Sequence, residues 1–154
     1  MAQQPTLTIY TGTSYLDDAG AGGWAVIIAS GEVRLQRSGT ERDTTNDGLE
    51  LLALIAGLLT LPTAGAVEIV TRNQRLARAL AGQLAAWQRQ GWRTSAGRPL
   101  RHAERWRRLA VLLQDRDVRC VLSRERVEPG LSAQARRLAA RVARTAAPAM
   151  GRTA

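Results

Sequence analysis

The chain has 154 residues, 45% of them hydrophobic, which is enough for one domain core and too apolar for a disordered chain. Its lone cysteine, Cys120, excludes an internal disulfide, and no apolar run reaches the ~20 residues that a bilayer requires. Residues 1–5 lack the basic and apolar segments of a signal peptide. We therefore expect a soluble cytoplasmic protein without a membrane partner, with a single domain over residues 5–146 and a disordered tail over residues 147–154.

Charge divides the chain into two unlike halves. All 22 basic residues are arginine. Residues 1–71 carry three Arg against eight acids, a net charge of −5, whereas residues 72–154 carry 19 Arg against five acids, a net charge of +14, and the two halves give the total of +9. A domain with one strongly basic half typically binds a polyanion, most often nucleic acid. The alternative is that arginine only solvates the outer faces of helices.

Three strands are expected first. Residues 6–11 alternate between apolar and polar side chains, as a half-buried strand does. A glycine-rich turn leads to a continuous apolar strand over residues 24–30, and Gly31 and Glu32 then form a hairpin turn into a strand over residues 33–38.

Helices and two more strands follow. We expect a helix from about residue 48 to 61 that is apolar nearly all round and therefore buried, a strand over 67–71, and a helix from Asn73. Residues 88–99 interrupt that helix and expose Trp92; a helix over 100–114, a strand over 118–122 and a helix from Ser132 complete the chain. This order, βββαβα(α)βα, predicts an α/β fold with a five-stranded mixed sheet and helices on both faces.

Five segments occur in an order and at a spacing that match a known family. They are residues 9–14 (Ile-Tyr-Thr-Gly-Thr-Ser), 20–25 (Gly-Ala-Gly-Gly-Trp-Ala), 44–51 (Thr-Thr-Asn-Asp-Gly-Leu-Glu-Leu), 71–74 (Thr-Arg-Asn-Gln) and 87–94 (Trp-Gln-Arg-Gln-Gly-Trp-Arg-Thr). Together they resemble bacterial ribonuclease HI, and the resemblance extends over about residues 6–144. It implies an RNase H-like fold.

The resemblance also implies chemistry that this chain lacks the residues to perform. The family holds two Mg²⁺ ions between four carboxylates, and those positions here are Gly12, Glu50, Arg72 and Arg136; the histidine of the family's mobile loop is replaced by Arg126. A guanidinium about 4 Å from a divalent ion costs roughly 8 kcal/mol at an effective dielectric of 20, and arginine cannot deprotonate to avoid this cost. We therefore expect no Mg²⁺ cofactor in the family's site.

Two alternatives for these positions stay open. Asp18, Asp47 and Glu50 are candidates for one relocated metal ion, although an Asp at a turn or a helix start more often caps backbone N–H groups. Arg72 and Arg136 either bind a nucleic-acid phosphate as bidentate donors or form ion pairs with Glu50.

Several further residues are candidates for nucleic-acid contacts. The resemblance places Thr45, Asn46 and Gln74 at positions that touch a minor groove and a phosphate, and His102 at a phosphate pocket; the plainer interpretation is helix capping for Thr45 and Asn46 and a surface histidine for His102. In the basic segment, the candidates for a surface that stacks on bases and binds phosphates are Arg89, Trp92, Arg93 and Arg101.

The leading hypothesis is a catalytically inactive RNase H-like protein that binds an RNA–DNA hybrid or another duplex through an arginine-rich surface. One alternative is a protein-interaction scaffold whose arginine-rich half docks an acidic partner. The other is residual hybrid-cleaving activity from a rearranged metal site.

Overall fold

A five-stranded mixed sheet forms the centre of the protein. The computed structural model describes residues 7–16, 20–62, 64–123 and 130–150, the last five of these by their backbone alone. The strand order is β3-β2-β1-β4-β5. β1 pairs antiparallel with β2 and β2 with β3, whereas β4 lies parallel to both β1 and β5. The strands are β1 (Leu7–Leu16), β2 (Ala21–Ser30), β3 (Val33–Arg42), β4 (Gly65–Thr71) and β5 (Arg116–Leu122).

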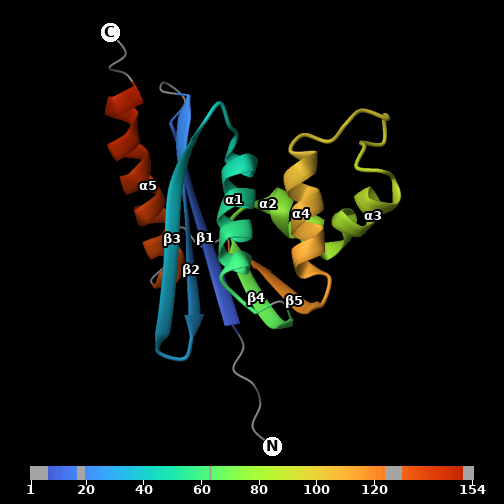
Figure 1. Cartoon of the computed structure of the whole chain (residues 1–154), viewed down its shortest axis with the longest axis horizontal. Helices are drawn as coiled ribbons and strands as arrows, with labels where there is room; N and C mark the ends of the chain where they lie inside the picture. Colours follow the sequence, from blue (N-terminus) through green and yellow to red (C-terminus); the bar gives the residue numbers. More distant parts are fainter. Residues whose placement is uncertain (1–6, 17–19, 63, 124–129, 151–154) are drawn as a thin grey trace, which may run out of the picture.

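Helices cover both faces of this sheet, so the predicted fold class is confirmed. α5 (Leu131–Met150) packs on β1, β2 and β3 from one side, and α1 (Asn46–Leu59) packs on the same strands from the other. Figure 1 shows α5 alone on its side of the sheet, with the other helices opposite. These are α2 (Gln74–Arg78), the π-helical segment η2 (Ala79–Gln83), α3 (Leu84–Arg89) and α4 (Ala103–Leu113).

The main core lies between the sheet and α1. Alternate residues of the strands enter it, as Ile9 does from β1 and Ile69 from β4, because successive side chains of a strand point to opposite faces. Trp106 of α4 is fully buried there and meets Trp87 of α3 edge to face, with ring centroids 5.0 Å apart. Trp87 and Trp106 are therefore packing residues.

On the other face, α5 approaches the sheet unusually closely. Its buried row of Ala135, Ala139 and Ala143 lies over Gly12 of β1 and Gly23 of β2. A Cβ built on Gly12 would lie 2.6 Å from the Ala135 carbonyl oxygen, so only glycine fits beneath the helix backbone. The small residues on both elements thus decide where α5 sits.

Two expectations about residues 73–99 need correction. The helix expected from Asn73 is divided, because Gly82 leaves helical geometry inside η2. Trp92 is only 8% exposed and belongs to the core, which contradicts the expectation that its side chain is exposed. The physical reason is a turn: Gly91 (φ 71°) and Trp92 (φ 64°) both adopt the left-handed conformation, and this reverses the chain and directs the indole inward.

At the C-terminus α5 continues to Met150 and so includes the first residues of the segment expected to be a tail, 147–154. The domain boundaries, 5–146, stay a prediction. Within the described residues no helix combines the length and the apolar character needed to cross a membrane.

Candidate functional site

A small polar pocket of about 80 Å³ opens where β1, α1, the end of β4 and α5 meet. The residues at the four positions that the resemblance singles out all line it: Gly12, Glu50, Arg72 and Arg136. β1, α1, α5 and the residue that follows β4 supply them from distant parts of the sequence, so the fold brings these positions together. The pocket therefore combines one carboxyl group with two guanidinium groups.

Glu50 is a buried hydrogen-bond acceptor in this pocket. Its side chain is 4% exposed, and its Oε1 accepts a hydrogen bond from the Thr71 hydroxyl at 2.6 Å and another from the Thr11 hydroxyl. Burial raises the pKa of the Glu50 carboxyl; the two threonine hydrogen bonds act in the opposite direction, and the charge of Asp47 adds to the increase. This carboxyl is therefore held in place by the two flanking strands.

Asp47 is engaged with its own neighbours. Its Oδ1 accepts from Asn73 Nδ2 at 2.9 Å, and Arg75 Nε lies 3.7 Å from its Oδ2. Asn73 in turn caps α2, since its Oδ1 accepts from the Leu76 N–H at 2.9 Å. Asp18, the third member of the alternative metal set, lies outside the described residues. Within the described part of the chain, no three acidic, histidine or cysteine side chains group closely enough to hold a metal ion.

The start of α1 forms a second polar cluster beside the pocket. The Thr45 hydroxyl caps the helix by accepting from the Gly48 N–H at 3.0 Å, so the capping interpretation of Thr45 is confirmed. The same hydroxyl lies 2.8 Å from His102 Nε2. Burial lowers the pKa of His102, with Arg105 and Arg101 contributing through their charges. His102 is thus partly buried and hydrogen-bonded to the capping residue Thr45, so it is not a freely exposed surface histidine.

Other predicted residues lie at the rim or farther away. Asn46 lines the pocket and accepts from the Thr13 hydroxyl at 2.7 Å. Arg89, Arg93, Arg101 and Gln74 are exposed and do not line the pocket. Arg93 also donates to the Gly97 carbonyl at 3.0 Å and so helps to fix the loop after α3. Arg126 lies outside the described residues.

Sequence reasoning missed the partners of Glu50. Thr11 and Thr71 are the residues immediately before Gly12 and Arg72, and both are buried. The available signal was strand alternation: a polar side chain on the inward face of a buried strand requires a hydrogen-bond partner.

Sheet order, helix placement and this pocket define the class of protein, an α/β domain of the RNase H type. The sequence profile of the RNase H family matches residues 4–122, and the chain belongs to that family. The match ends before α5, so it does not include Arg136, whose family position stays an expectation of the sequence resemblance.

Related proteins bear the same family name. Ribonuclease H of Bradyrhizobium diazoefficiens is 35% identical over 119 residues, which are 77% of this chain and 77% of the relative. Ribonuclease H of Nitrobacter hamburgensis is 36% identical over 115 residues, 75% of this chain and 76% of the relative.

Solved structures agree on the fold. LC9-RNase H1, a type 1 RNase H with the type 2 active-site motif, has a TM-score of 0.70 at 20% identity and covers 97% of this chain and 75% of its own. LC11-RNase H1, solved in complex with an RNA/DNA hybrid, has a TM-score of 0.67 at 20% identity and covers 92% of this chain and 99% of its own.

Family membership corrects the expectation about cofactors. We expected no Mg²⁺, but the relatives are ribonucleases H, a family that normally uses Mg²⁺, and this is the ion that membership implies. The residues that line the pocket do not fit the family's metal site, because one buried carboxyl stands there beside Arg72 and Arg136. The side chains that line this pocket thus do not match the ligands that the family's cofactor requires.

Proposed function

We propose that this chain is a catalytically inactive RNase H-like protein that binds a nucleic-acid duplex, an RNA–DNA hybrid or another duplex, through an arginine-rich surface. The observation that carries the proposal is that Arg72 and Arg136 line the same pocket as Glu50. The sequence resemblance implies that the family has acids at these two arginine positions. Two cations favour a phosphate at this place, whereas four carboxylates without metal repel one.

Three features support a duplex as the ligand. Arg89, Arg93 and Arg101 are exposed near the loop that follows α3, where they are available for phosphate contacts. LC11-RNase H1 was solved with an RNA/DNA hybrid, and the foamy viral protease-reverse transcriptase, which shares this fold with a TM-score of 0.70 at 20% identity, was solved with double-stranded DNA. Residues 72–154 carry a net charge of +14, as counted above.

Trp92 has no part in this surface, because its ring is buried. Thr45, Asn46, Gln74 and His102 stay in the proposal as candidates for groove contacts at the start of α1, α2 and α4. Their present hydrogen bonds would have to coexist with a ligand, so we assign the phosphate-binding role chiefly to the arginines.

A combined binding and cleavage assay tests the proposal. Single strands, DNA duplex, RNA duplex and hybrid are titrated at low salt, and the hybrid is then incubated with Mg²⁺ or Mn²⁺. We expect the hybrid to be bound and to stay intact. Cleavage that survives rigorous purification and is lost in Glu50→Gln would refute inactivity, and failure to retain any duplex would refute nucleic-acid binding.

A further inference from the structure

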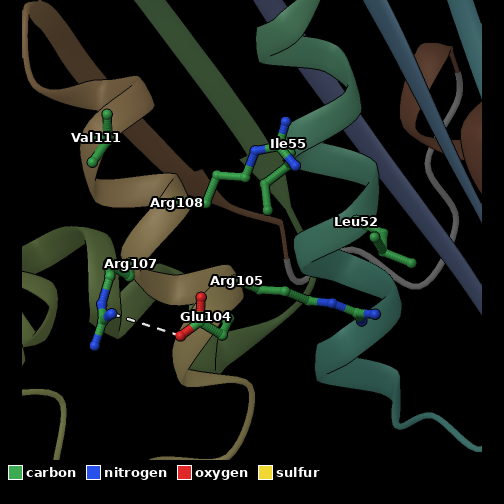
Figure 2. A pocket seen from close by; sticks show the side chains of 7 residues that line it. All are labelled: Leu52, Ile55, Glu104, Arg105, Arg107, Arg108 and Val111. Atoms are coloured by element: carbon green, nitrogen blue, oxygen red, sulfur yellow. Dashed lines mark ion pairs between the residues drawn. The ribbon is translucent and has the colours of Figure 1, made fainter.

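An apolar groove runs between α1 and α4, on residues that take no part in the polar pocket. It has a volume of about 500 Å³, within the ~300–1,000 Å³ typical of binding pockets. Leu52 and Ile55 of α1 and Val111 of α4 form its apolar lining (Figure 2). A second hollow of about 300 Å³, lined by Leu58, Leu59 and Leu112, also reaches Val111, so the two meet at this residue.

The solvent side of this groove is more apolar than that of an ordinary surface helix. Most residues of α1 are buried, but Leu52 and Ala56 are partly exposed and Leu59 is exposed, and all three are apolar. Leu59 is 50% exposed and Val111 is 65% exposed, although surface helices normally present charged or polar residues at such positions. Exposed apolar side chains that adjoin one another around a hollow typically mark an interaction site.

Cations stand along the α4 side of the groove. Arg108 is exposed and has no ion pair within the described residues. In Figure 2 its side chain extends from α4 toward Ile55 of α1. Arg107 lies 3.6 Å from Glu104, but both side chains are exposed, and such a pair contributes little to stability. Arg105 is different, because Glu41 and the Gly48 carbonyl already hold it. The Arg107 Cζ also lies 6.0 Å from the centroid of the Trp92 ring. Arg108 is therefore the cation available to a ligand, and Arg107 would exchange its exposed pair with Glu104 for a ligand carboxylate.

We propose that this groove docks an acidic amphipathic helix of a partner protein. Apolar side chains two turns apart (i and i+7) would occupy the hollows beside Leu52 and Leu59, which are themselves seven residues apart on α1, as helices do in hydrophobic grooves. Carboxylates on the flank of the helix would pair with Arg107 and Arg108, for which arginine offers two parallel donors. A nucleic-acid backbone has no apolar groups for these hollows, so the chemistry favours a protein ligand. The inference is independent of nucleic-acid binding.

The probe is a panel of fluorescein-labelled helical peptides with Leu or Phe at i, i+4 and i+7, or at i, i+3 and i+7, and Glu elsewhere. Two matched sets replace the apolar anchors with Ser or the Glu residues with Lys. Fluorescence anisotropy with the full chain should detect the acidic apolar peptides and neither matched set. Arg108→Glu and Val111→Asp alter exposed side chains, so both variants should fold, and each should weaken binding by at least about tenfold (~1.4 kcal/mol).

Controls separate this groove from general charge effects. Val33→Asp on β3, which changes a side chain that is 62% exposed, and Arg141→Glu on α5 should leave peptide affinity within about twofold. The Val111→Asp variant should bind the RNA–DNA hybrid with the same affinity as the parent chain. The proposal is wrong if no peptide of the panel binds, if the Ser-substituted set binds equally well, or if hybrid or phosphatidylglycerol vesicles displace the peptide from the groove.

Discussion

Gly12 on β1 lies directly beneath Arg136 on α5: a Cβ added to Gly12 would come within 2.5 Å of the Arg136 backbone nitrogen. The helix backbone thus occupies the space that an acidic side chain at position 12 would need. A carboxylate at position 12 would therefore require α5 to move away from the sheet.

Gly12→Asp should therefore destabilise the chain and should not restore cleavage of a hybrid. Overpacking of this kind costs about 1–3 kcal/mol, because α5 must move away from the sheet. Urea unfolding followed by circular dichroism measures the loss. Thr13→Ala is the matched control on the same strand, since it removes one exposed hydrogen bond without a clash. A Gly12→Asp variant that is as stable as the parent would show that α5 does not press on this position.

The role of Glu50 is tested by its pH dependence. Burial raises the pKa of this carboxyl in the folded state, so between the unfolded and folded pKa values the folded chain binds more protons than the unfolded chain. The stabilising contribution is then fully present below the unfolded pKa and is lost as the pH rises through the folded pKa. Glu50→Gln should remove this decline, and urea unfolding at a series of pH values with EDTA measures it.

Glu50→Leu is the informative comparison. It leaves the hydroxyls of Thr11 and Thr71 without their acceptor, which should cost about 1–3 kcal/mol for each buried donor. Glu50→Gln keeps an acceptor oxygen and should avoid most of that cost. Equal stability of the Gln and Leu variants at neutral pH would contradict the bonding described for this pocket.

A third prediction concerns the start of α1. Thr45→Ala removes the N-cap and the contact with His102, and should lower the free energy of unfolding by about 1 kcal/mol. Thr45→Ser retains an oxygen at the same position and should stay close to the parent chain. Thermal unfolding of the two variants provides the measurement, and an Ala variant as stable as the Ser variant would contradict the capping role.

Much of this architecture could be predicted from sequence because the signals are local. Strand alternation, the hairpin at Gly31 and the cap at Thr45 each depend on neighbouring residues, and the spacing of the family motifs was enough to bring Gly12, Glu50 and Arg72 to one pocket. Two features depend on contacts between distant segments and were missed. The threonine partners of Glu50 come from β1 and β4, and the buried ring of Trp92 depends on a left-handed turn at a residue type that rarely adopts one.

The last prediction concerns where a duplex would be bound. Arg89→Ala with Arg93→Ala removes two exposed cations from the segment after η2, so binding should weaken about equally for every duplex sequence. The slope of log K against log salt is negative, and its magnitude should decrease by up to about 2, because each phosphate contact contributes roughly −0.9 to the slope for B-form DNA. Anisotropy titrations of the hybrid and of a DNA duplex at four or more salt concentrations measure both quantities.

The control pair is Arg137→Ala with Arg141→Ala. Both arginines are exposed on α5, which Figure 1 shows on the opposite side of the sheet from α3, so they should contribute little to a duplex bound near Arg89 and Arg93. A silent 89/93 pair together with a 137/141 pair that abolishes binding would move the binding surface to α5. In that case Arg89 and Arg93 would have no part in holding the duplex, and the segment after η2 would not be the phosphate-binding surface.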